Sequence, residues 1–282
     1  MRKFAIMLAP LLLGLTAPTL AENLSTADPL WEVRLGGFGR YGEAYPGSTE
    51  LQVNVVPLPF PIYRGKFLRL GDRTEKPVRT RLLRWDKVKL DIDFGLNFPV
   101  DSDDIAARRG MPDLDLLAEV GPELEFQFAE PLLGGETRLA LQARGAVSWD
   151  GLSPDWRGMI LSTELKHRRK VFTPRTELYT RITPEFASRD YMDFFYGVPE
   201  AFATATRDAY RARSGYLGTR LSFTVKHRFN RRFEVRSGLR FGLYQGARNA
   251  ESPLLTRDFT NSFFLAFLWK FWESEARAAE DF

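Results

Sequence analysis

Hydrophobic and polar residues alternate along much of this chain. In residues 87–98 every second residue from Val88 to Phe98 is apolar, and the residues between them are Lys, Asp, Gly or Asn. Because successive side chains of a strand point to opposite faces, this segment predicts a strand with one apolar and one ionic face. A strand pattern of this kind occurs in eleven segments, at residues 31–41, 51–61, 67–70, 87–98, 119–128, 138–144, 159–166, 177–182, 217–229, 232–243 and 263–271.

This many two-faced strands indicate an all-β protein. A soluble sandwich can contain such strands, but in an outer-membrane barrel the apolar face meets lipid and the polar face meets an aqueous lumen. These barrels normally have an even number of strands, so we expect a further strand within residues 72–83 or 189–214. We predict an antiparallel transmembrane β-barrel of about 12 strands, with about 10 as the alternative. The 23 Phe, 9 Tyr and 6 Trp residues suit the aromatic girdles of such a barrel.

The start of the chain indicates secretion. Arg2 and Lys3 precede an apolar run, and Thr19-Leu20-Ala21 provides small residues at a cleavage site, so residues 1–21 read as a signal peptide cleaved after Ala21. The chain has no cysteine, which excludes disulfides and a lipid-modified cysteine. Together with the strands, this predicts the cell outer membrane of a Gram-negative bacterium, with membrane lipid and lipopolysaccharide as surroundings.

The organisation that follows is a single barrel with two short ends. We expect residues 22–29 to be an N-terminal periplasmic segment, residues 30–272 to form the barrel, and residues 273–282 to be a solvated acidic tail. Residues 131–136 and 230–231 are expected to be short periplasmic turns. Residues 99–112, 188–214 and 245–261 are expected to be long outer loops. Without Arg2 and Lys3 the formal charge falls from +4 to +2, which does not indicate a nucleic-acid partner.

The polar faces of the strands supply the candidate functional residues. Acidic residues gather on two strands, and basic residues gather on two later ones. In the structural interpretation, salt bridges between these residues close the lumen. In the functional interpretation, they line a narrow pore and produce an electric field across it. The small predicted strand number favours the closed lumen, because long side chains leave little space. The lumen-facing candidates are Lys87, Lys89, Asp91, Asp93, Glu119, Glu123, Glu125, Arg220, Lys226, Arg228, Arg232, Arg236 and Arg240.

Other residues give little support for catalysis or metal binding. His227 falls on an apolar face, and Ser237 would be its diagonal neighbour if residues 230–232 form a turn. Diagonal Cβ atoms lie about 7–8 Å apart, too far for a nucleophile and its base. His167 lies in a basic strand end, and residues 101–104 lack the glycine and distal glutamate of a calcium loop. We therefore expect no enzyme, no metal site and no cofactor.

Several short motifs, in order and spacing, resemble the MipA/OmpV family of outer-membrane proteins. They cover nearly all of the chain after residue 21, and comprise Gly37-Phe38-Gly39-Arg40-Tyr41, Tyr45-Pro46-Gly47-Ser48, Pro57-Leu58-Pro59 with Tyr63-Arg64, Gly110-Met111-Pro112-Asp113-Leu114-Asp115, Glu119-Val120-Gly121-Pro122, Phe195-Tyr196-Gly197-Val198 with Tyr210 and Gly215, and the strand at 262–271. Family chains often end at the aromatic residue that closes the last strand. Here Phe271 is followed by a tail to Phe282, so either phenylalanine is a candidate insertion signal.

The resemblance implies a non-enzymatic protein. It suggests a scaffold that links a murein lytic transglycosylase to a murein synthase in peptidoglycan remodelling. The alternatives within the family are a narrow porin-like channel for small polar solutes and an adhesin, because one fold hosts several functions. The candidate partner-binding segments of a scaffold are residues 22–29, 72–87 and 273–282.

Overall fold

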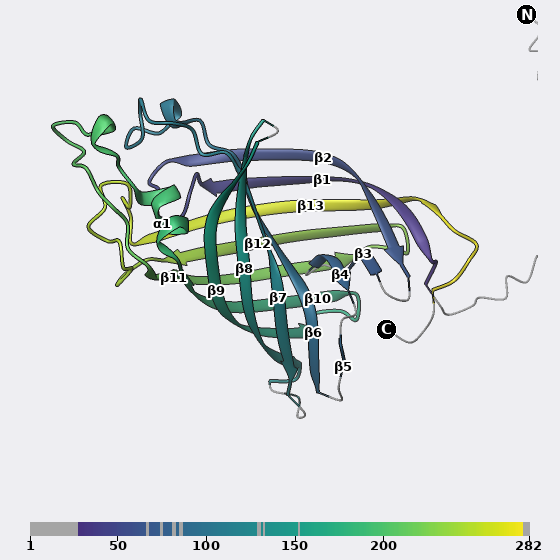
Figure 1. Ribbon diagram of the computed structural model, residues 1–282. Helices are drawn as coiled ribbons and strands as arrows, with labels where there is room; N and C mark the ends of the chain where they lie inside the picture. The colour runs from purple at the N-terminus through teal and green to yellow at the C-terminus, as the bar shows by residue number, and fades with distance from the viewer. Residues whose placement is uncertain are drawn as a thin grey trace, which may run out of the picture.

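The computed structural model describes residues 28–65, 68–73, 76–80, 83–84, 87–128, 131, 133–151 and 153–278. These residues form one antiparallel sheet that curls into an incomplete barrel (Figure 1). Apart from β4 and β5, which form the two edges of the sheet, strands that follow one another along the chain pair as neighbours, and β1 also pairs with β13. The predicted signal peptide and cleavage site lie outside the described residues. None of the helices in the described part of the chain is long and apolar enough to cross a membrane.

The strands confirm the predicted all-β antiparallel architecture. Each of the eleven predicted segments falls on a strand, and the further strand expected within residues 72–83 is also present. The strands are β1 (Trp31–Glu43), β2 (Leu51–Arg64), β3 (Leu68–Arg73), β4 (Lys76–Thr80), β5 (Leu83–Arg84), β6 (Val88–Asn97), β7 (Leu116–Gln127), β8 (Glu136–Asp150), β9 (Ser153–Lys170), β10 (Thr176–Ala187), β11 (Gly215–Arg228), β12 (Phe233–Leu243) and β13 (Phe259–Glu273).

The short strands β4 and β5 explain the strand number. β3 and β6 run in the same direction, because an even number of antiparallel pairings separates them in the sheet. β4 is antiparallel to β3, and β5 is antiparallel to β6, so β4 and β5 also share one direction. Only residues 81 and 82 separate them in the chain, and β4 also lies against β6. Counted as one interrupted strand, they reduce the described thirteen strands to twelve.

The long connections between strands lie at one end of the sheet. The segments 98–115, 188–214 and 244–258 gather there together with 44–50, and we call this the loop end (Figure 1). The connections 128–135, 171–175 and 229–232 lie at the other end, which we call the turn end. The loop end also carries the helices η1 (Ser102–Asp104), α1 (Arg189–Tyr196) and η2 (Glu200–Phe202). The second place suggested for a missing strand, residues 189–214, therefore contains helices instead.

The start of the C-terminal segment pairs with residues that precede and begin β1. Ser274 N donates to Trp31 O at 2.9 Å, and Leu30 N donates to Ala276 O at 2.7 Å. Ala278 N donates to Asp28 O at 2.8 Å, and Pro29 forms a bridge with Arg277. The first part of the predicted acidic tail thus continues the pairing of β1 with β13.

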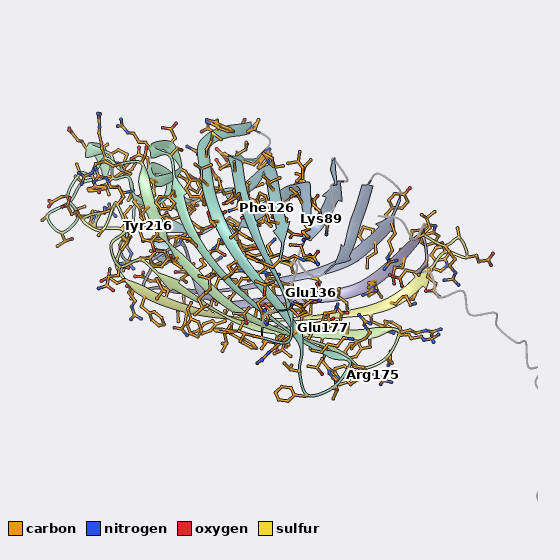
Figure 2. All side chains as sticks on the ribbon, turned by 90° about the horizontal axis from the view of Figure 1, so that it is seen from below. Lys89, Phe126, Glu136, Arg175, Glu177 and Tyr216 are labelled. Atoms are coloured by element: carbon orange, nitrogen blue, oxygen red, sulfur yellow. The ribbon has the colours of Figure 1, made fainter. Side chains whose placement is uncertain are left out.

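The two faces of the sheet differ in polarity in the way that an outer-membrane barrel requires. On β9, Leu161 is 52% exposed while the next residue, Ser162, is 5% exposed. On β2, Val53 and Val55 are 65% and 72% exposed. Exposed apolar side chains on a convex face are stable when the surrounding solvent is lipid. Figure 2 shows side chains on both faces, with Tyr216 toward the loop end and Arg175 at the turn end.

Candidate functional site in the barrel interior

Arg144 on β8 is the centre of the first buried ion-pair network on the concave face. Its Nη1 lies 2.9 Å from Asp93 Oδ2 on β6, and its Nη2 lies 3.4 Å from Glu185 Oε1 on β10. Its Nε lies 3.2 Å from Glu119 Oε2 on β7, but without hydrogen-bond geometry. The side chains of all four residues are at most 10% exposed. Glu185 also pairs with Arg220 on β11, so this network joins five strands.

Lys166 on β9 is the centre of a second network. Its Nζ lies 3.2 Å from both Glu123 Oε1 and Glu164 Oε1, and 3.5 Å from Glu125 Oε2. Glu123 is fully buried and also accepts a hydrogen bond from Gln142 Nε2 at 2.7 Å. Buried charges are tolerated when they are paired and hydrogen-bonded, as they are here.

A third network lies nearer the turn end and contains predicted basic residues. Lys226 Nζ is 3.6 Å from Glu177 Oε2 and 3.6 Å from Glu234 Oε2. Arg236 pairs with the same Glu234, and Arg228 Nε lies 3.8 Å from it. Arg228 is itself 57% exposed, so this network opens toward the turn end.

Charge in the interior is therefore compensated between neighbouring strands. Asp93, Glu119, Glu123 and Glu125 pair with Arg144 or Lys166. Arg220, Lys226, Arg228 and Arg236 pair with Glu177, Glu185 or Glu234. Two opposed walls of opposite charge do not form. Sequence reasoning left these compensating residues out of the candidate set, although all except Glu185 occupy the polar phase of the predicted strand segments.

Of the remaining predicted lumen residues, some lie in the interior and others do not. Lys89 Nζ lies 3.8 Å from Glu125 Oε1, and Asp91 Oδ1 accepts a hydrogen bond from Ile92 N at 2.9 Å. Lys87 and Arg232 are exposed outside the strands, at the turn end. Arg240 lies at the opposite end, below the loops.

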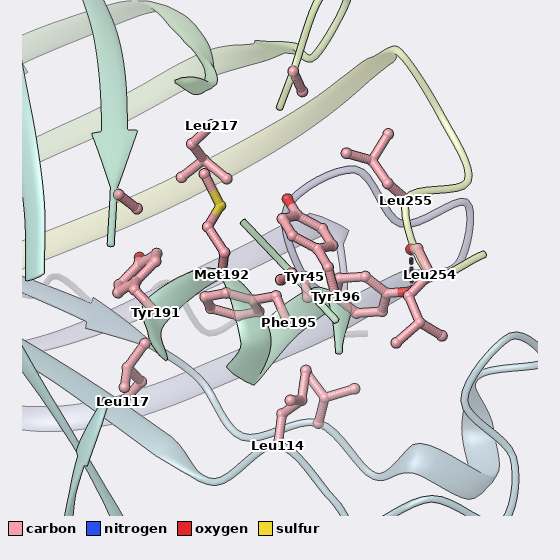
Figure 3. Close-up of a cluster of buried hydrophobic side chains, with 14 of the residues drawn as sticks. Tyr45, Leu114, Leu117, Tyr191, Met192, Phe195, Tyr196, Leu217, Leu254 and Leu255 are labelled. Carbon is pink, nitrogen blue, oxygen red and sulfur yellow. Dashed lines mark hydrogen bonds between the residues drawn. The ribbon is translucent and has the colours of Figure 1, made fainter. Parts of the chain in front are cut away.

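The loop-end segments pack together into a hydrophobic cluster, which we call the loop cap (Figure 3). Apolar residues from all four segments contribute, and α1 places Met192, Phe195 and Tyr196 in its middle, each at most 2% exposed. Tyr45 Oη donates to Leu254 O at 2.7 Å, and Tyr196 Oη donates to Pro46 O at 3.0 Å. The main apolar core of the described residues thus covers one end of the barrel.

Burial changes the protonation behaviour of the loop cap. It raises the pKa of Tyr45 to about 12, and it raises the pKa of Tyr191 and of Tyr196. Burial also lowers the pKa of Arg108, which donates to Phe195 O at 3.3 Å and to Pro112 O at 3.0 Å. Tyr191 Oη donates to Glu119 at 2.7 Å, and this bond connects the loop cap to the Arg144 network.

Comparison with known proteins agrees with this architecture. The sequence matches the family described as MltA-interacting protein MipA over residues 35–271. The chain belongs to the MipA family. It is an antiparallel β-barrel of the Gram-negative outer membrane, as the sequence predicted. No curated protein matches it.

Solved structures similar to this MipA-family chain are distant. The COG4313 outer membrane channel from Pseudomonas putida F1 is 12% identical, with a TM-score of 0.45 over 87% of this chain and 97% of the channel. OmpT from Vibrio cholerae is 9% identical, with a TM-score of 0.40 over 86% of this chain and 96% of OmpT. Neither likeness is close enough to assign an activity.

The histidines and the acidic loop of this MipA-family member have structural partners. His227 pairs with Val235, the register that the predicted turn required, and its Nδ1 lies 2.8 Å from Thr176 Oγ1. His167 Nδ1 lies 3.0 Å from Thr137 Oγ1. Asp101 and Asp103 accept hydrogen bonds from the backbone N–H groups of Asp103 and Gly110. Over the described ranges, no cluster of His, Cys, Asp and Glu residues could hold a metal ion.

Proposed function

We propose that this MipA-family barrel is a closed, non-enzymatic scaffold that binds a murein lytic transglycosylase at its turn end, and through it a murein synthase. The observation that carries the proposal is the interior, where buried ion pairs join neighbouring strands beneath the loop cap. Such an interior favours a structural barrel over a water-filled pore. The description of the family as MltA-interacting protein supports a protein partner.

The turn end offers a surface that suits a protein partner. Leu133 and Phe172 occupy the tips of two connections that flank the β8–β9 pair, and they are 84% and 97% exposed. Both have positive φ angles, of 50° and 59°. A non-glycine residue rarely adopts this conformation, which costs about 1–3 kcal/mol and often marks a functional position. Exposed aromatic and aliphatic side chains of this kind are typical anchors of protein interfaces.

Basic side chains surround these two anchors. Arg168, Arg169 and Lys170 line a groove with Gly134 and Gly135 beside the Leu133 turn, where Glu136 and Glu177 pair with Arg168 and leave Arg169 and Lys170 as the excess charge. Arg175 is exposed in the same connection as Phe172. A basic rim steers an acidic partner surface and sets its orientation more than its affinity.

Two measurements test the proposal. In planar bilayers we expect no steady conductance, and steady conductance that falls in Asp91→Asn and Asp93→Asn would refute the closed barrel. In capture assays, nanodisc-embedded protein should retain a purified lytic transglycosylase, and Phe172→Ser should reduce retention at least about tenfold, the effect of losing an interface anchor. Phe259→Ser, an exposed phenylalanine at the loop end, is the matched control and should retain the enzyme normally. Equal retention by both variants would refute docking at the turn end.

A further inference from the structure

A cavity of about 230 Å³ lies directly beneath the loop cap, at the loop end of the interior. Its walls come from the ends of several strands together with α1. Arg40 on β1 pairs with Phe264 on β13, and Arg240 on β12 pairs with Ser262 on β13. Since Ser262 and Phe264 are two residues apart, they point to the same face. The two arginines therefore flank β13 and both line the cavity.

These two arginines differ from the arginines and the lysine at the centres of the ion-pair networks. Arg144, Lys166 and Arg220 each lie in an ion pair with at least one glutamate. In contrast, within the described residues Arg240 has no hydrogen bond or ion pair, and the guanidinium of Arg40 donates only to the Glu43 backbone carbonyl, at 3.0 Å. Two partly desolvated guanidinium groups with no carboxylate at ion-pair distance favour the binding of an anion.

The carboxylates of the cavity are already engaged elsewhere. Glu43 accepts hydrogen bonds from Gly47 N and Tyr244 Oη, both at 3.0 Å. Glu119 and Glu185 belong to the Arg144 network. The charge of Glu43 acts on both arginines, and that of Glu185 acts on Arg240, but within the described residues neither arginine has a carboxylate at ion-pair distance.

Aromatic rings form the apolar part of the wall. Phe38 stacks on Phe98 with ring centroids 6.2 Å apart and on Phe264 with centroids 6.0 Å apart. All three phenylalanines line the cavity, together with Phe194 of α1. The cavity therefore combines two cations with an aromatic surface, which matches a ligand with one anionic and one apolar part.

We propose that this cavity binds a small aromatic carboxylate, whose carboxylate bridges Arg40 and Arg240 while its ring packs against Phe38, Phe98 and Phe264. The size agrees, because an apolar cavity of about 150 Å³ holds benzene. The additional volume here accommodates a carboxylate group. This site does not depend on the scaffold role, since it lies at the opposite end of the barrel from the proposed docking surface.

The test uses full-length protein in nanodiscs of zwitterionic lipid and para-fluorobenzoate as the probe, observed by fluorine NMR. We expect saturable binding that benzoate displaces and that uncharged benzamide does not. Acetate, which lacks the ring, should compete at least tenfold more weakly than benzoate. These comparisons use the native protein, so they do not depend on whether any variant folds.

Substitutions then locate the site. Arg240→Gln and Arg40→Gln should each weaken binding about tenfold or more, the usual effect of removing a hydrogen bond to a charged group. Arg232→Gln is the matched control, because Arg232 is exposed at the turn end, and its affinity should equal that of the native protein. Displacement by benzamide as strong as by benzoate would overturn the proposal. Equal competition by acetate, or an Arg240→Gln variant that binds like Arg232→Gln, would overturn it as well.

Discussion

Replacing Arg144 by Met should destabilise the barrel more than any exposed charge substitution. Arg144 is 6% exposed and faces Asp93, Glu119 and Glu185, which come from three different strands. Removing one partner of a buried ion pair costs about 3–5 kcal/mol, because the remaining charge is left buried with less compensation. Folding free energies are typically about 5–15 kcal/mol, so this loss is a large fraction of the total.

Equilibrium urea unfolding, followed by tryptophan fluorescence in detergent micelles, measures this effect. Arg168→Met is the control: Arg168 is 38% exposed, and its Nη2 lies 2.8 Å from Glu136 Oε1. Exposed pairs of this kind are worth about 0–1 kcal/mol, so the control should unfold close to the native protein. The reasoning is refuted if Arg144→Met loses no more free energy of unfolding than Arg168→Met does.

Three further predictions concern the loop end. The pKa of Tyr45 in the folded protein is about 12, above its ordinary value of 10.0. The stability that this group contributes is therefore complete below pH 10 and is lost as the pH rises through 12. Tyr45→Phe should remove one late phase from the tyrosinate absorbance titration and lower the free energy of unfolding by about 1 kcal/mol. In urea unfolding, Gly158→Ala should lower the free energy of unfolding more than Gly246→Ala does. Both glycines have positive φ, but only at Gly158 would an added Cβ meet another atom, Ser188 Oγ, at 2.2 Å. Asn249→Ala should cost about 1–3 kcal/mol and speed proteolysis of the loop cap, because Asn249 accepts from Arg213 N and donates to Arg213 O.

Each of these has an outcome that would contradict it. A tyrosinate titration unchanged by Tyr45→Phe would show that Tyr45 does not titrate late. Equal losses in the two glycine variants would mean that the contact with Ser188 is relieved at no cost. Native resistance to protease in Asn249→Ala would show that its bonds do not hold residues 188–214 to residues 244–258.

The strands were predictable because lipid outside and polar side chains inside impose a period of two on every spanning segment. Leu161 and Ser162 show how sharply exposure follows that period. The same pattern placed Asp93 and Glu119 on the polar face. It could not show that one residue, Arg144, would reach both of them and Glu185, because the curvature of the sheet brings β6, β7, β8 and β10 together.

The loop cap was not predicted, although part of its pattern is visible in the sequence. Tyr191, Met192, Phe195 and Tyr196 have the spacing of one helix face, and all four are buried in α1. A helix of eight residues is unstable alone and forms only when tertiary contacts cover that face. The segments that cover it, such as 44–50 and 244–258, carry no periodic pattern of their own, so sequence reasoning treated this region as loops.

The prolines of β2 explain where the barrel wall is incomplete. Leu51–Ile62 pair with β1 alone among the described residues, and β3 joins β2 only at Tyr63 and Arg64. Pro57, Pro59 and Pro61 have no N–H to donate, and as alternate residues they face the same edge of the strand. Because the ladder with β1 is continuous, that edge must be the one facing away from β1, toward β6. A full backbone ladder between β2 and β6 would lack the N–H donors of these three prolines. Near the loop end a side chain joins the two sides instead, because Gln52 Nε2 donates to Pro99 O at 2.9 Å.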